Sequence, residues 1–156
     1  MTDFARLAAL VAVLATAVVY GTDVFCALVL RPALARVDDR ALVAVMGNVH
    51  LYGDRRMPVP GAISVVAAAA GVVLAGLGGR WVAAGASATA VGLLLIWLAL
   101  YLRVSAPINR RLTTAATAGD VPPDARVLQS DWDRIITARA VLQGLALVAL
   151  CLALVS

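Results

Sequence analysis

The sequence predicts an all-α integral membrane protein, a four-helix bundle with short extra helices in two long cytoplasmic loops. Of its 156 residues, 63% are hydrophobic and only 14% are charged, whereas soluble domains average about 45–50% apolar and about 25% charged residues. Four apolar stretches approach or exceed the roughly 20 residues of a membrane-crossing helix. None of them shows the alternation of apolar and polar residues that a membrane barrel requires.

We therefore expect a single membrane domain over residues 1–156, with spans at about 5–30, 60–77, 81–102 and 138–155. The first span is interrupted by few polar residues, among them Asp23. The second follows Pro60 and ends at the Gly78-Gly79-Arg80 turn, and the third begins at Trp81. Small residues are frequent in the second and third spans, and they allow helices to approach closely in lipid.

Both long loops carry helical patterns. Pro32 suits the first turn of a helix, where its missing N–H costs little, and apolar residues recur after it at near-helical spacing from Leu34 to Val49. Pro107 opens a second polar helix directly after the third span. Ser130 is the expected N-cap of the last helix, with Asp131 and a second aspartate in its first turn.

The charges predict how the chain is oriented. All 13 basic residues are arginine and all nine acidic residues are aspartate. Eleven arginines lie in or beside the two long loops, and only Arg6 and Arg80 lie on the other side. By the positive-inside rule, we expect cytoplasmic long loops and both termini outside a bacterial-type plasma membrane. Membrane lipid is an expected partner, a homo-oligomer is left open, and the interleaving of arginine with aspartate argues against nucleic-acid binding.

Three polar groups are candidates for chemistry. Asp23 lies within a predicted span, and an ionisable group at membrane depth is either functional or paired with an arginine for assembly. His50, the only histidine, precedes Asp54 by four residues, so the two share a helix face and can orient an imidazole for general-base catalysis. These three residues are also the only metal-ligand candidates, and no cofactor or metal site is predicted. Trp132 and Arg139 share the inward face of the last helix and are expected to contact a ligand.

The chain resembles the anthrone oxygenase family, a group of small four-helix membrane proteins, over nearly its whole length. The motifs that carry the resemblance are Gly21 and Phe25 leading to Pro32 and Leu34, Met57-Pro58, Pro107-Ile108-Asn109-Arg110-Arg111-Leu112, and Trp132-x-Arg134 followed by Arg139. The resemblance implies oxidation of an anthrone-type polyketide to a quinone by dioxygen, without a dedicated organic cofactor.

For that reaction the protein needs a base, a cation for the oxyanion and an apolar slot for the fused rings. His50 or Asp23 is the candidate base, with Asp54 beside the histidine. The candidate oxyanion partners are Arg55, Arg134 and Arg139. Trp132 and Tyr52 are candidates for stacking on the hydrophobic aromatic substrate, and Asn109 completes the candidate substrate-binding set.

Two classes compete with this enzymatic interpretation. One is a non-enzymatic membrane protein that binds a lipid or a hydrophobic metabolite, or that is a subunit of a membrane complex. In that case Asp23 and the arginines form a structural ion-pair network, and arginines contact anionic head groups. The other is transport, which four short spans could support only as an oligomer.

Overall fold

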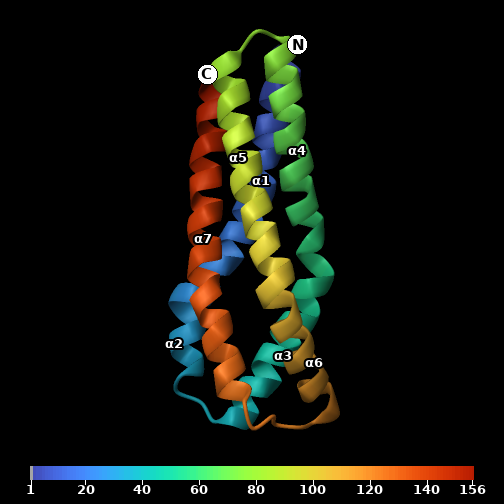
Figure 1. Ribbon diagram of the computed structural model, residues 1–156, viewed down its shortest axis with the longest axis vertical. Helices are drawn as coiled ribbons and strands as arrows, with labels where there is room; N and C mark the ends of the chain where they lie inside the picture. The colour runs from blue at the N-terminus through green and yellow to red at the C-terminus, as the bar shows by residue number, and fades with distance from the viewer. Residues whose placement is uncertain (1) are drawn as a thin grey trace. The chain divides into compact units, whose positions relative to one another are not determined.

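The computed structural model describes residues 2–156, and over this range the chain forms α-helices and two short π-helical segments but no strand (Figure 1). The elements are α1 (Thr2–Phe25), η1 (Cys26–Leu30), α2 (Arg31–Leu34), α3 (Asp39–Arg56), α4 (Pro58–Leu77), α5 (Trp81–Leu100), η2 (Tyr101–Ser105), α6 (Ala106–Ala118) and α7 (Ala125–Val155). The prediction of an all-α fold is confirmed.

Among the described residues, four helical stretches are long and apolar enough to cross a membrane, as the sequence predicts. They are Asp3–Leu34, Pro58–Leu77, Trp81–Ala118 and Ala125–Val155. The helices α4 and α5 have 20 residues each, and at 1.5 Å per residue each matches the hydrocarbon core of a bilayer, which is about 30 Å thick.

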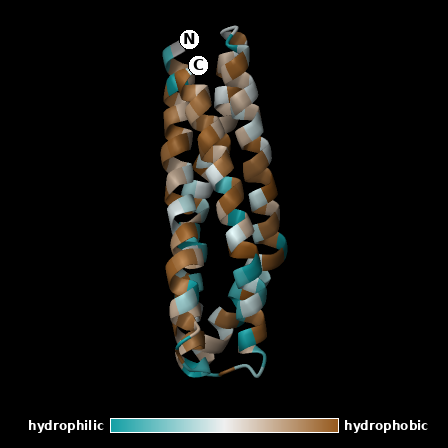
Figure 2. Ribbon diagram, turned by 90° about the vertical axis from the view of Figure 1, so that its left-hand side faces the viewer, coloured by the Kyte–Doolittle hydropathy of each residue, from teal (hydrophilic) through white to brown (hydrophobic). Residues whose placement is uncertain are grey.

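The chain divides into two compact units. Unit 1 contains the residues up to Gly21 together with Val59–Leu98 and Val141–Ser156, and unit 2 contains Thr22–Pro58 and Ala99–Ala140. Unit 1 holds only three charged residues, Asp3, Arg6 and Arg80, so the other 19 lie in unit 2. Figure 2 shows this contrast as mostly apolar helices in unit 1 and frequent hydrophilic residues in unit 2. Polar chemistry is therefore concentrated in unit 2.

Small residues allow close helix contact in unit 1. A Cβ atom at Gly61 of α4 would lie 3.2 Å from the ring of Trp97 on α5, and one at Gly71 would lie 3.2 Å from the Oγ atom of Ser87. The start of α1, the end of α7 and the turn between α4 and α5 lie at the same end of this unit (Figure 1). The chain runs along unit 1 an even number of times, so its first and last helical segments finish at the same end of the unit.

Each π-helical segment of unit 2 ends two residues before a proline. Proline has no N–H, and its ring clashes with the carbonyl four residues earlier, which disfavours a regular α-helix at that point. In η1 the N–H of Arg31 bonds to the carbonyl of Cys26, and in η2 the N–H of Ala106 bonds to that of Tyr101. The wider turns carry the chain into Pro32 and Pro107 without ending the helix, so α5, η2 and α6 are continuous.

The helices α3 and α6 pack closely against each other in unit 2. The side chain of Asp38 accepts a hydrogen bond from the N–H of Ala41 at 2.8 Å and caps the start of α3. Further along α3, a Cβ atom at Gly47 would overlap Ala116 Cβ and lie 2.7 Å from the carbonyl oxygen of Leu112. Only glycine fits at this crossing, which sets the position of the α3 residues that follow, His50 and Asp54.

Two local predictions were wrong. Ser130 is not the N-cap of the last helix, because α7 begins at Ala125 and the carbonyl of Asp124 accepts its first bond, from the N–H of Leu128 at 3.0 Å. The prolines at 122 and 123 end the preceding loop and place the helix start there. The first long loop is not one helix, since α2 and α3 are separated at residues 35–38.

Candidate functional site

A buried ion pair joins α1 to α7 within unit 2. Asp23 and Arg139 are 3% and 7% exposed, and Arg139 Nη2 donates to Asp23 Oδ1 at 3.0 Å. Arg139 Nη1 donates to the Oγ atom of Ser105 at 2.9 Å. The guanidinium carbon also lies 5.4 Å from the ring centroid of Tyr101, within cation–π range. The guanidinium of Arg139 is thus held between α1 and η2.

A second cluster centres on the carboxylate of Asp54. Its Oδ1 atom accepts one hydrogen bond from the hydroxyl of Tyr101 and one from Asn109 Nδ2, both at 2.8 Å. The Oδ1 atom of Asn109 accepts a further bond from the indole Nε1 of Trp132 at 3.0 Å. Because Tyr101 contacts both Asp54 and Arg139, the two clusters form one continuous polar network, which we call the Asp54–Arg139 network.

His50 lies beside this network with an unsatisfied nitrogen. The side chain is 3% exposed, and its ring centroid is 5.3 Å from that of Trp132, with the planes tilted by 56°. Within residues 2–156 no hydrogen-bond partner lies near its Nε2 atom. An unpaired polar atom in the interior carries a desolvation cost, so a bound ligand that reaches Nε2 would recover that cost.

The surroundings of His50 keep the imidazole neutral. The pKa of His50 is lowered from 6.5 to about 4. Burial is the largest cause, the charge of Arg139 acts in the same direction, and the charge of Asp54 partly opposes them. At neutral pH one ring nitrogen therefore carries a lone pair. A neutral imidazole of this kind can accept a proton or a hydrogen bond from a ligand, or ligate a metal.

The structure brings six of the nine sequence-predicted site residues together. Five belong to the Asp54–Arg139 network, and His50 packs against one of them; the six are Asp23, His50, Asp54, Asn109, Trp132 and Arg139. The expected burial of Trp132 and Arg139 on one face of the last helix is confirmed, since they are 5% and 7% exposed.

Three predicted substrate-binding residues lie elsewhere on the surface of unit 2. Tyr52 is 51% exposed, and its ring is covered by the guanidinium of Arg56, whose central carbon lies 5.2 Å from the ring centroid. Arg55 is exposed. Arg134 is exposed and pairs with Asp131 at 3.4 Å. Among the described residues, none of the three forms a hydrogen bond or an ion pair with the side chains of the Asp54–Arg139 network.

Two network residues were not identified as site residues from the sequence. They are Tyr101 and Ser105 of η2. Both precede Asn109 in steps of four residues, a spacing that places polar groups on one side of a helix. This polar stripe at 101, 105 and 109 was the available signal.

The predicted metal candidates do not converge. Over residues 2–156 no group of three His, Cys, Asp or Glu side chains lies close enough to hold a metal ion. Asp23 is paired with Arg139, and Asp54 accepts from Tyr101 and Asn109. Nothing in the geometry of these residues therefore adds a second ligand to His50.

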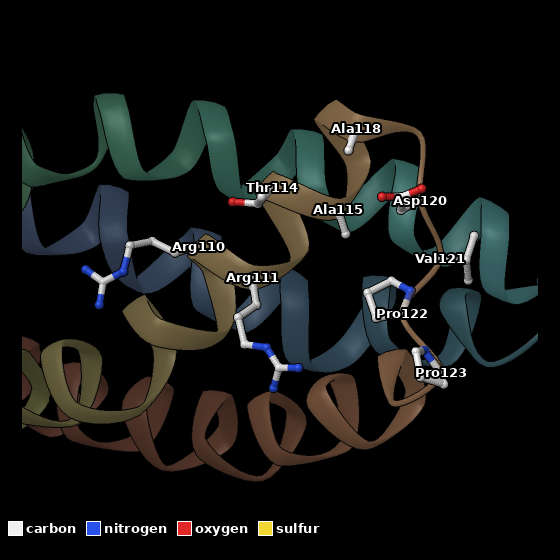
Figure 3. Close-up of a pocket in the computed structure, with 9 residues that line it drawn as sticks. All are labelled: Arg110, Arg111, Thr114, Ala115, Ala118, Asp120, Val121, Pro122 and Pro123. Atoms are coloured by element: carbon white, nitrogen blue, oxygen red, sulfur yellow. The ribbon is translucent and has the colours of Figure 1, made fainter.

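An arginine-lined pocket is present in unit 2. Its volume is about 630 Å³, and its walls come from α6 and from the loop that follows (Figure 3). The lining residues are Arg110, Arg111, Thr114, Ala115, Ala118, Asp120, Val121, Pro122 and Pro123. Arg111 is paired with Asp124 at 2.9 Å. None of the nine predicted site residues lines this pocket.

Comparison of the chain with protein-family models, with curated proteins and with solved structures finds no match. The resemblance to the anthrone oxygenase family therefore rests on its short motifs, and the function has to be argued from the chemistry of the residues around His50.

Proposed function

We propose that this chain is a membrane-bound oxidoreductase that acts with dioxygen on an aromatic substrate of the anthrone type. The observation that carries the proposal is the buried, neutral imidazole of His50, whose Nε2 atom lacks a partner and whose neighbour is the ring of Trp132. A planar substrate needs an aromatic wall and a base at one edge. Trp132 and His50 supply this pair of groups.

The reaction begins with proton transfer. His50 Nε2 removes one proton from the methylene carbon of the substrate, and the electron pair of the broken C–H bond remains on the ring system. Because the histidine is neutral at neutral pH, it can accept this proton. The new anion then stabilises the imidazolium beside it, since opposite charges attract strongly where water is excluded.

The substrate anion supplies the electrons for the oxygen step. It forms a C–O bond with dioxygen, and the proton returns to the outer oxygen to give a hydroperoxide. Loss of the second methylene proton, with cleavage of the O–O bond, leaves a carbonyl group and releases water. One CH₂ group and one O₂ molecule thus become one C=O group and one water, with dioxygen as the four-electron oxidant.

The charge of Arg139 contributes to the stability of the anion. It acts on His50 through space and disfavours the imidazolium, so the same charge favours a negative ligand at that position. Asp23 and Ser105 hold the guanidinium in place through two hydrogen bonds. Asp23, the other candidate base, is engaged with Arg139 and is assigned this supporting role.

A second candidate function is non-enzymatic binding of a lipid or a hydrophobic metabolite, or a role as a subunit of a membrane complex. The observation that favours it is that the buried acid Asp23 pairs with the buried base Arg139 inside the chain. Such a pair can also have a purely structural role, in which it holds the helices together without taking part in chemistry. Under this alternative, a bound aromatic molecule would be recovered unchanged.

We also propose that the protein lies in a bacterial-type plasma membrane with both long loops on the cytoplasmic side and both termini outside. The support is the charge distribution, because eleven of the 13 arginines lie in unit 2 and cytoplasmic loops carry an excess of arginine.

The experiment is an assay of detergent-purified protein with an anthrone, following oxygen uptake and quinone formation against heat-denatured protein. We expect wild-type protein to consume one O₂ per quinone formed, and His50→Gln to lose turnover because it cannot take the proton. Asp131→Asn, a change at a surface ion pair, is the matched control and should keep wild-type turnover. Absence of turnover in wild-type protein, or normal turnover in His50→Gln, contradicts the proposal.

A further inference from the structure

The carboxylate of Asp54 connects three other elements of unit 2 to α3. It accepts directly from Tyr101 on η2 and from Asn109 on α6, and through Asn109 it is linked to Trp132 on α7. The function proposed above gives this side chain no catalytic step. Its contacts nevertheless end on the aromatic ring that packs against His50.

The two hydrogen bonds of Asn109 determine which way its amide points. A carboxylate only accepts hydrogen bonds, an indole N–H only donates, and an amide has its donor and its acceptor on different atoms. With Nδ2 toward Asp54 and Oδ1 toward Trp132, both bonds form. A flipped amide would set oxygen against the carboxylate and N–H against N–H, which breaks both bonds. The acceptor at Asp54 therefore selects the amide orientation that holds the indole.

The consequence reaches His50 through the ring of Trp132. Both rings are buried, and their centroids are 5.3 Å apart. An indole held by a hydrogen bond at Nε1 keeps one tilt against the imidazole, whereas an indole without that bond can rotate about its side-chain torsions.

We propose that Asp54 is a positioning residue that acts through Asn109 on the indole of Trp132 and so fixes the aromatic wall beside His50 Nε2. Its effect on turnover rests on the proposed function. Its effect on the state of the Trp132 indole does not, so the two can be tested separately.

The first test is spectroscopic. Full-length protein labelled with ¹⁵N-tryptophan in detergent gives indole resonances from three tryptophans, and Trp132→Phe assigns the one of interest. We expect Asp54→Ala to move or broaden the Trp132 N–H resonance, and Asn109→Ala to move it in the same direction. Asp54→Asn keeps an oxygen that accepts from Asn109 and Tyr101, so this variant should retain the wild-type resonance. Asp131→Asn is the control and should change nothing.

The second test is turnover of an anthrone by the same variants. We expect Asp54→Ala to lose about tenfold to a hundredfold in rate, the cost of a misplaced reacting group, and Asp54→Asn to recover most of it. An unchanged Trp132 resonance in Asp54→Ala overturns the positioning role, as does a resonance in Asp54→Asn displaced as far as in Asn109→Ala. If wild-type protein has no turnover, the proposed function fails while the resonances still decide the role of Asp54.

Discussion

Acidification is expected to destabilise the folded protein through His50. Burial and the charge of Arg139 lower the pKa of this histidine to about 4 in the folded chain, whereas its ordinary pKa is 6.5. Between these two values the unfolded chain binds a proton that the folded chain does not. The free energy of unfolding is therefore highest above about pH 6.5 and falls as the pH drops toward 4.

The size of the effect follows from the two pKa values. Each pKa unit corresponds to about 1.4 kcal/mol, so protonation of His50 in the unfolded chain alone lowers the free energy of unfolding by up to about 3 kcal/mol. About 2 kcal/mol of this loss is reached near pH 5. This is a large share of the 5–15 kcal/mol typical of a folded domain. The interval is favourable for measurement, because His50 is the only histidine and aspartates ordinarily titrate near pH 4.

Denaturant titration in mixed micelles, at about pH 7 and about pH 5, measures this difference. We expect wild-type protein to lose about 2 kcal/mol between the two conditions and His50→Gln, which has no titrating ring, to lose little. Equal stability of the wild-type protein at both pH values would refute the argument. Equal losses in the wild-type protein and in His50→Gln would show that another group is responsible.

Three further predictions concern packing, charge and orientation. Gly47→Ala should lower the free energy of unfolding by about 1–3 kcal/mol, because the added Cβ would overlap α6. Gly53→Ala has open space around the added Cβ and should be neutral or stabilising by up to about 1 kcal/mol. Chemical denaturation of both variants measures these changes. Arg139→Gln should cost about 3–5 kcal/mol, since it breaks the buried ion pair with Asp23, and the double change with Asp23→Asn should recover part of the loss. Arg134→Gln at the surface should change stability by less than about 0.5 kcal/mol. A cysteine-reactive or protease-sensitive tag at the C-terminus should be accessible from outside intact cells, and protection of that tag would contradict the proposed orientation.

The spans could be predicted from the sequence because they depend on a local property, the length of an apolar stretch. Their ends could not, because the polar stretches after Leu100 and before residue 138 continue as helix. At η2 the chain passes Pro107 by widening its turn, so the proline marks a π-helical segment and not the start of a separate helix. A proline signal alone does not distinguish these two outcomes.

The candidate residues around His50 could be predicted in part for a similar reason. Asp23 and Arg139 stood out because charge is rare in apolar segments, and their burial is what that rarity indicates. Tyr101 and Ser105 were missed as site residues because neither residue type is unusual at the end of a span. Their contacts depend on which helices lie side by side in unit 2, and hydrophobic patterns carry little of that information. Tyr52 and Arg55 were included because they neighbour His50 in sequence, although the structure exposes both.

The most direct test of the account is oxygen uptake by detergent-purified protein supplied with an anthrone, measured together with quinone formation for the wild-type protein and for His50→Gln. The account predicts one O₂ consumed per quinone by the wild-type protein, and a rate for His50→Gln that falls to that of heat-denatured protein. Recovery of the anthrone unchanged from the wild-type protein, or equal rates for the two proteins, would contradict it.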